Sequence, residues 1–239
     1  MDQAFEIGLN IINKLRETQS EKLEEAGKQI AHRFMDGHHF FVSGSGHSHT
    51  LAEEFYGRAG TLAFTIPILT NELTLTEHPT KSSYIERLNG YATILANLYH
   101  IQKDDIILIA SNSGRNAYPV ELALEAKKRG AFVVAVTSVN HSSAVDSRHE
   151  SGKKLMDIAD IVIDNCGVLG DSALQLDGMK TTICPTSSMA NTFIAQAISV
   201  ACCEELIKNN VEPPVFVSLN CDGNETVNDE LFKKYTRLY

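Results

Sequence analysis

The sequence predicts an α/β fold of three layers, in which a doubly wound, five-stranded parallel sheet lies between layers of helices. Two observations support this prediction. After Asp105, the segment 105–110 (DIILIA) is continuously apolar, and so is the segment 132–136 (FVVAV); such runs are typical of strands buried on both faces of a parallel sheet. Strand-like and helix-like segments also alternate along the chain, as they do in doubly wound sheets.

The elements follow one another in a regular order. Strands are expected at 39–43, 62–68, 105–110, 131–137 and 158–164. Helices are expected at 48–59, 80–99, 116–129 and 186–208, of which the last is apolar nearly all round and is therefore expected to be buried. Residues 165–184 have no clear period, and we expect an irregular excursion there.

Helical patterns also precede the first strand. Residues 2–37 carry two apolar faces and predict a pair of amphipathic helices, divided at the capping-box spacing of Thr18 and Glu21. We expect three regions: the helical pair at 1–37, the α/β domain at 38–210, and a tail at 211–239. The apolar faces of the helical pair predict a homodimer or homotetramer. Alternatively, these helices cover the sheet of their own subunit.

Composition excludes several classes of partner. The net charge of −9 argues against a nucleic-acid surface, since binding a polyanion needs a basic face. No apolar run approaches the length of about 18 residues that a membrane helix needs, and the N-terminus lacks a signal-peptide pattern. The five cysteines have no metal-binding spacing. We therefore expect a cytoplasmic protein with no membrane partner, no metal and no cofactor.

Two turns rich in glycine and serine, each between a strand and a helix, carry the chemistry. They read SGSGHS at 43–48 and SNSGRN at 111–116. A helix N-terminus presents unpaired N–H groups to an anion, glycine lets the backbone approach it, and serine adds donors. The candidate ligand-binding residues are Gly44, Ser45, Gly46, His47 and Ser48 in the first turn and Ser111, Asn112, Ser113, Gly114 and Asn116 in the second. Two such turns predict an anionic small molecule such as a phosphosugar.

Other phosphate-binding motifs fit less well. The first turn begins like the dinucleotide motif G-x-G-x-x-G, but His49 occupies the place of its third glycine. No acidic residue after the second strand is placed to hold a ribose. Neither turn continues into the Gly-Lys-Ser/Thr of a Walker A loop. A metal held by His47 and His49 lacks a supporting Cys or carboxylate pattern.

The two turns resemble those of the sugar isomerase (SIS) domain of phosphosugar isomerases and phosphosugar-binding proteins. The resemblance covers about residues 38–210, and the second turn is its more specific half. It implies that Ser111, Ser113 and Asn116 hold the sugar phosphate and that Ser45 and Ser48 line the same pocket. A hydroxyl cluster at 185–188, which includes Ser187, is expected at the rim.

As a whole, the chain is similar to stand-alone SIS proteins described as phosphoheptose isomerases. This likeness implies an aldose–ketose isomerase of a sugar phosphate. The alternatives are a non-catalytic phosphosugar sensor and, as a third reading, an etherase or lyase of an amino-sugar phosphate. Because one fold hosts many functions, the choice depends on the residues of the site.

An isomerase needs a base that moves a proton between C1 and C2, and two positions offer one. Glu77 and His78 follow the second strand and are expected to face the mouth of the site, although an exposed acidic loop would have the same pattern. Glu54 lies in a segment that resembles the base-bearing stretch of bacterial heptose isomerases, but it follows Ser48 more closely than expected, and it could instead pair with Arg58.

The group that would open the sugar ring is harder to place. Heptose isomerases carry a histidine on the C-terminal helix, and this chain has no histidine after His149. The role therefore falls to His78, His141 or His149, or the protein is not a heptose isomerase. The polar loop at 140–154 is either a solvated loop or a segment that closes over the sugar, as a lid of its own subunit or as a contribution to the site of a partner subunit.

Overall fold

The computed structural model describes residues 1–224 and 226–235 and has the α/β architecture expected. A five-stranded, fully parallel sheet has the order β2-β1-β3-β4-β5. Its strands are β1 (Phe40–Gly44), β2 (Thr65–Ile68), β3 (Ile106–Ala110), β4 (Phe132–Thr137) and β5 (Ile161–Asp164). The order reverses beside β1, so the carboxyl ends of β1 and β3 flank a topological switch point, where doubly wound sheets bind ligands.

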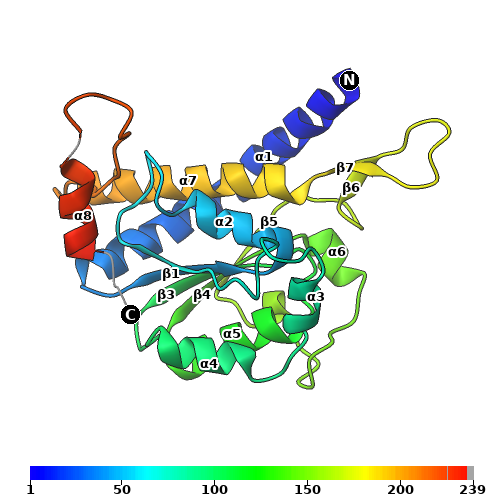
Figure 1. Ribbon diagram of the computed structural model, residues 1–239, viewed down its shortest axis with the longest axis horizontal. Coiled ribbons are helices and arrows are strands. Elements are labelled where there is room, and N and C mark those ends of the chain that lie inside the picture. The colour runs from blue at the N-terminus through cyan, green and yellow to red at the C-terminus, as the bar shows by residue number, and fades with distance from the viewer. Residues whose placement is uncertain (225, 236–239) are drawn as a thin grey trace.

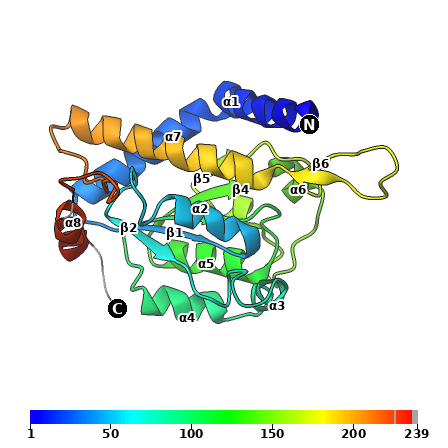
Figure 2. The same cartoon turned by 45° about the horizontal axis from the view of Figure 1, so that its top comes forward.

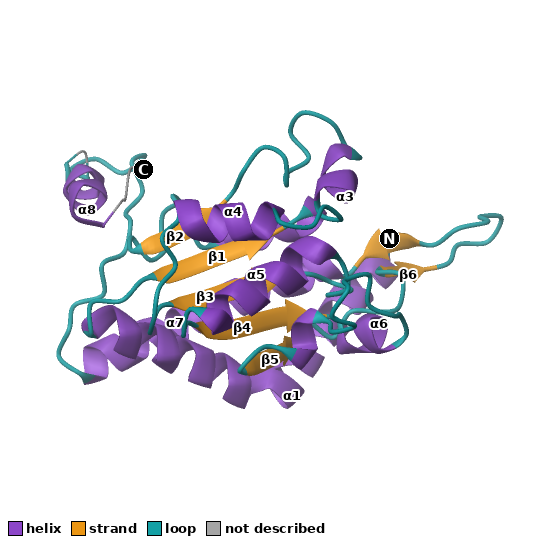
Figure 3. Cartoon of the chain, turned by 90° about the horizontal axis from the view of Figure 1, so that it is seen from below, coloured by secondary structure: helices purple, strands orange, loops and turns teal. Residues whose placement is uncertain are grey.

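Helices cover both faces of the sheet, as Figures 1 and 3 show. On one face lie α1 (Asp2–Met35), α2 (His49–Glu54) and α7 (Ser187–Lys208), and on the other lie α4 (Tyr91–Leu98) and α5 (Ala117–Lys128). Successive residues of β3 alternate between these two cores: Ile106 and Leu108 face the first, and Ile107 and Ile109 face the second. This alternation explains why the central strands are apolar throughout.

The expected pair of N-terminal helices is a single helix, α1, and that prediction was wrong. The hydroxyl of Thr18 donates a 2.7 Å hydrogen bond to the carbonyl of Lys14, one turn back, and so does not cap a new helix. The buried stripe of α1 also continues without a break from Leu15 through Gln19 to Leu23. In Figure 2, α1 runs beside α7, and its N-terminal turns extend past the sheet.

Three further expectations need correction. The helix expected at 80–99 is divided into α3 (Lys81–Ile85) and α4, because Gly90 has a φ of 85° and interrupts it. The excursion at 165–184 contains an antiparallel hairpin of β6 (Ser172–Leu174) and β7 (Ile183–Pro185). Although α7 was expected to be buried, one face of it is exposed, at Phe193, Val200 and Ile207.

The remaining elements connect and close the domain. They are the 3-10 turns η1 (Gly46–Ser48) and η2 (Leu155–Asp157), and the helices α6 (Val139–Ser143) and α8 (Val227–Tyr235). The tail meets the domain through a bridge between Leu62 and Val215. In the described part of the chain, no helix has the length and apolar character required to cross a membrane.

Candidate functional site

Both glycine- and serine-rich turns lie at one edge of the sheet. Gly44, the last residue of β1, pairs with Ala110, the last residue of β3, so the turns leave the sheet side by side. Close backbone packing requires glycine at the first of these positions, because a Cβ on Gly44 would lie 2.4 Å from the carbonyl oxygen of Ser48. Gly46 and Gly114 have positive φ values of 57° and 60°, which other residues rarely adopt. These glycines therefore shape the two turns.

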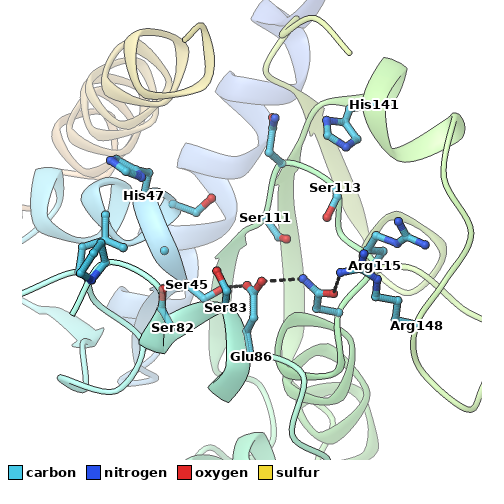
Figure 4. A pocket seen from close by; sticks show the side chains of 16 residues that line it. Ser45, His47, Ser82, Ser83, Glu86, Ser111, Ser113, Arg115, His141 and Arg148 are labelled. Atoms are coloured by element: carbon cyan, nitrogen blue, oxygen red, sulfur yellow. Dashed lines mark hydrogen bonds between the residues drawn. The ribbon is translucent and has the colours of Figure 1, made fainter. Parts of the chain in front are cut away.

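A cavity of about 430 Å³ lies between the turns (Figure 4). From the sequence-predicted set, its lining includes Ser45, Gly46, His47, Ser48, Ser111, Asn112, Ser113 and Asn116. The lining also contains Leu75, Pro79, Ser82, Ser83, Glu86, Arg115, His141 and Arg148, which the sequence-based assignment omitted or left open. The loop at 140–154 supplies His141 and Arg148, so this polar loop forms part of the wall.

Glu86 is the one acidic residue in the lining of this cavity among the described residues. The hydroxyl of Ser45 donates a 2.6 Å hydrogen bond to its Oε2, and Nδ2 of Asn116 donates a 2.7 Å bond to its Oε1. Burial raises the pKa of Glu86 above its usual value, while the Ser45 hydroxyl and Arg87 act in the opposite direction. A fixed carboxylate with a raised pKa is the kind of group that serves as a general base near neutral pH.

Two guanidinium groups lie on the opposite wall from His47, as Figure 4 shows. Arg115 forms no ion pair or side-chain hydrogen bond within the described residues, and its Nε is buried without a partner. Arg148 is exposed at the mouth and donates one hydrogen bond of 3.1 Å, to Oδ1 of Asn116. Desolvation and the charges of Arg115 and Arg87 lower the pKa of Arg148. An anion bound between Arg115 and Arg148 would relieve their repulsion.

The hydroxyl groups of the cavity are mostly free to bind a ligand. Ser111 accepts a 3.2 Å hydrogen bond from the backbone N–H of Gly114. The hydroxyls of Ser48, Ser83 and Ser113 have no protein partner within the described residues. Free hydroxyls beside guanidinium groups suit a polyhydroxylated anion.

Two histidines reach the cavity, at His47 and His141. The backbone N–H of Gly170 donates to Nδ1 of His141 at 3.3 Å. In the neutral ring the proton is therefore on Nε2, which makes this atom a hydrogen-bond donor. His49 is different: it is buried, bonds the Gly46 carbonyl through Nδ1, and lies 3.2 Å from Glu53 through Nε2. Within residues 1–224 and 226–235, no three His, Cys, Asp or Glu side chains gather as metal ligands would.

The acidic residues proposed from the sequence lie outside the cavity lining. Glu77 has an exposed side chain and pairs with Lys81, one helical turn on. His78 is exposed beside Thr80. Both positions differ from the expected orientation toward the mouth, and the Glu77 carboxylate pairs instead with a lysine close to it in sequence. Their catalytic roles stay predictions.

Two other predicted residues also have local partners. Glu54 binds Arg58 at 2.8 Å and accepts a 3.2 Å hydrogen bond from Gln196 on α7. Ser187 was expected at the rim, but its hydroxyl donates a 2.8 Å bond to Asp171, and it does not line the cavity. This contact fixes the start of α7 to the base of the β6–β7 hairpin.

Comparison with known proteins identifies the family. The sequence matches the family model described as SIS domain over residues 5–138, more than half of the chain. The chain belongs to the SIS domain family. It is also 43% identical to a UPF0309 protein of Halalkalibacterium halodurans, across 95% of this chain and 94% of that protein. A UPF0309 protein of Thermoanaerobacter pseudethanolicus is 44% identical, across 95% and 93% of the two chains.

Solved SIS structures have the same fold at low sequence identity. A phosphoheptose isomerase from Francisella tularensis superposes with a TM-score of 0.53 at 16% identity, covering 85% of this chain and 96% of the other. The Vibrio vulnificus NanR protein, solved in complex with ManNAc-6P, gives 0.55 at 13% identity, covering 99% and 70%. These likenesses confirm the fold class predicted from the strand–turn–helix pattern. The chemistry of the SIS site has to be argued from its own residues.

Proposed function

We propose that the protein binds a phosphorylated sugar in the cavity between the two turns and interconverts its aldose and ketose forms, with Glu86 as the base. The observation that carries this proposal is the setting of Glu86. It is an acidic side chain in a cavity of hydroxyls and guanidinium groups, and hydrogen bonds hold both of its oxygens. Glu86 lines the cavity and can therefore contact a bound ligand, whereas Glu54 and Glu77 do not line it.

The phosphate is assigned to the second turn and the arginine pair. Ser111 and Ser113 offer hydroxyls at the end of β3, and Arg115 and Arg148 offer positive charge beside them. Charge-assisted hydrogen bonds of this kind are about twice as strong as neutral ones. Asn116, to which the family resemblance gives a phosphate contact, uses both amide atoms on Glu86 and Arg148. We therefore place the phosphate on Arg148 rather than on the amide of Asn116.

The reaction requires one proton to move between neighbouring carbons. In the open-chain aldose phosphate, the Glu86 carboxylate removes the C2 proton, and the electron pair forms an enediolate with the carbonyl carbon C1. The hydroxyl proton moves from O2 to O1, and the protonated carboxyl returns its proton to C1, which leaves the carbonyl at C2 and gives the ketose. We assign the assistance of ring opening to His141, whose Nε2–H would donate to the ring oxygen. Its position at the cavity wall favours it over His78 and His149.

A panel of aldose and ketose phosphates tests this function. The purified protein is incubated with each compound in deuterated water, and exchange at C1 or C2 is followed by NMR. Exchange that requires the phosphate group supports the isomerase. Exchange is expected with at least one member of the panel and is expected to be absent with the matching unphosphorylated sugar.

A sensor that binds without catalysis is the second candidate. The fold likeness to NanR, solved with a bound amino-sugar phosphate, favours this alternative. Thermal stabilisation by a sugar phosphate, without any proton exchange, would support the sensor over the isomerase. The etherase or lyase reading would instead require loss of a substituent from an amino-sugar phosphate, which the same spectra would record.

A further inference from the structure

The side chain of Asn116 lies between the guanidinium group of Arg148 and the carboxylate of Glu86. Its Oδ1 accepts a 3.1 Å hydrogen bond from Arg148, and its Nδ2 donates the 2.7 Å bond to Glu86. The residue is buried, and it precedes α5 without capping it, because its side chain makes no bond to the first turn. The side chain of Asn116 therefore serves the site rather than the stability of α5.

The two hydrogen bonds of Asn116 depend on each other. A cation bound to the amide oxygen polarises the amide and makes its N–H a stronger donor, as in other hydrogen-bonded chains. A stronger donor at Oε1 favours the charged form of Glu86. If a phosphate takes the guanidinium of Arg148, both the polarisation and the favourable charge at Glu86 are reduced.

We propose that Asn116 is a positioning residue that transmits the occupancy of the anion site at Arg148 to Glu86, so that the base binds protons more strongly once the anion is bound. This inference rests on the proposed function for the identity of the anion. The bound sugar phosphate would thereby prepare the Glu86 carboxylate to remove the proton from C2 of the sugar. Before the anion binds, the hydrogen bonds from Ser45 and Asn116 orient the same group and favour its charged form against the effect of burial.

Other charged groups near Glu86 also favour its charged form. Arg87 adjoins it in the chain, and Arg148 approaches from the loop after α6; both lower its pKa. Arg115, His47 and His141 line the same cavity. An anion that neutralises the arginines removes a favourable charge, and its own negative charge further disfavours the carboxylate. The contribution through Asn116 must therefore be separated from the contribution through space.

Carboxyl-labelled glutamate in the intact protein allows this separation by ¹³C NMR. The resonance of Glu86 is assigned by its loss in Glu86→Gln, and its titration midpoint is followed against pH. In the ligand-free protein, Asn116→Leu should raise the midpoint by about one pH unit, since one donor to the charged form is lost. Ser83→Ala, in the same cavity but without a bond to Glu86, should leave it unchanged. An unchanged midpoint in Asn116→Leu would overturn the positioning role.

A saturating concentration of sulfate, a dianion whose charge is constant over the titration, then tests transmission. The wild-type midpoint should rise on sulfate binding, and the rise should be smaller in Asn116→Leu, where only the effect through space is left. An equal rise in both proteins, or no rise in the wild type, would overturn the transmission. The ligand-free result does not depend on a sugar phosphate, so failure of the substrate panel would contradict the proposed function while the positioning role stands.

Asn116→Asp keeps the shape of the side chain and provides a second test if Asn116→Leu does not fold. It replaces the donor by a second carboxyl, and two carboxylates this close cannot both ionise easily. The Glu86 midpoint should then rise at least as far as in Asn116→Leu. An unchanged Glu86 midpoint in Asn116→Asp would contradict the direct contact between the two side chains on which the proposal rests.

Discussion

Oε1 of Glu86 accepts a 2.7 Å hydrogen bond from Asn116, 30 residues further along the chain. The backbone repeats the connection, since the N–H of Tyr118 donates to the carbonyl of Glu86 at 2.9 Å. The short helix α3 ends just before Glu86, whereas α5 is packed into the core. The position of the acid is therefore set by α5 and the turn that precedes it.

The first prediction concerns the base. Glu86→Gln keeps the shape of the side chain but removes proton transfer, so proton exchange at the sugar should fall by about 10²-fold or more. Affinity for the sugar phosphate should change much less. Exchange rates and calorimetric titration measure the two effects. Glu77→Gln and Glu54→Gln are matched controls, and a loss of exchange in either, with normal exchange in Glu86→Gln, would transfer the role.

The second prediction concerns stability and pH. Because burial raises the pKa of Glu86 in the folded state above its usual 4.5, the folded protein binds more protons here than the unfolded chain does. The contribution of this raised pKa to the free energy of unfolding is thus complete below pH 4.5, and it is lost as the pH rises through the pKa of Glu86 in the folded protein. Relative to the wild type, Glu86→Gln should gain free energy of unfolding over this window. Urea denaturation at a series of pH values measures it, and a constant difference would contradict the raised pKa.

The third prediction concerns the anion site. Ser113→Ala should weaken sugar-phosphate binding by about 1–3 kcal/mol if the hydroxyl donates to the dianion. Arg148→Met should weaken it at least as much and should reduce the dependence of affinity on salt. Neither side chain contributes to the core, so thermal unfolding without ligand should change little. Unchanged affinity in both variants would place the phosphate elsewhere.

The strands could be predicted because their signal is local. A strand buried on both faces, such as β3, must be apolar at every position, and a turn that brings Gly44 within reach of Ser48 must contain glycine. The break within the expected helix 80–99 was missed, although Gly90 marks it. At Thr18 the opposite error occurred, because a break was predicted where the helix is continuous. A threonine hydroxyl can bond back to the preceding turn, here to Lys14, as well as cap a new helix.

The base could not be chosen from local pattern. Glu77 beside His78 looks catalytic in the sequence, but Lys81 is four residues away and binds it. Glu86 has no distinctive neighbours, and its partners Ser45 and Asn116 come from the two turns that follow β1 and β3. Only the folded sheet brings these three residues together. Arg115 was visible within the second turn, but nothing in the sequence indicates that its Nε lacks a partner.

The fourth prediction concerns the contact between α1 and α7. A Cβ on Gly27 would lie 2.6 Å from Cβ of Ala201 and 2.7 Å from the backbone nitrogen of Cys202. Gly27→Ala should therefore force the helices apart and destabilise the protein by about 1–3 kcal/mol, despite the better helix propensity of alanine. Gly8→Ala is the control in the same helix, where the new Cβ meets only Met189 at 3.7 Å. It should be neutral or slightly stabilising, and equal effects in the two variants would contradict the tight contact.

The last prediction concerns self-association, which we propose takes place through the outer face of α7. Phe193, Val200 and Ile207 recur every seven residues along this helix and are 48%, 56% and 63% exposed. Phe193 also borders an apolar groove of about 180 Å³ against α1. Exposed apolar stripes on long helices are typical of a contact between two copies of a chain.

Light scattering at micromolar concentration should accordingly give at least twice the chain mass of 26.3 kDa. Val200→Glu should shift the protein toward the monomer, because a carboxylate in the centre of the stripe would be buried without a partner. Leu98→Glu removes a similarly exposed side chain (60%) from α4, on the opposite face of the sheet, and should leave the mass unchanged. A wild-type monomer would overturn the proposed association, whereas an oligomer unaffected by Val200→Glu would move the interface away from α7.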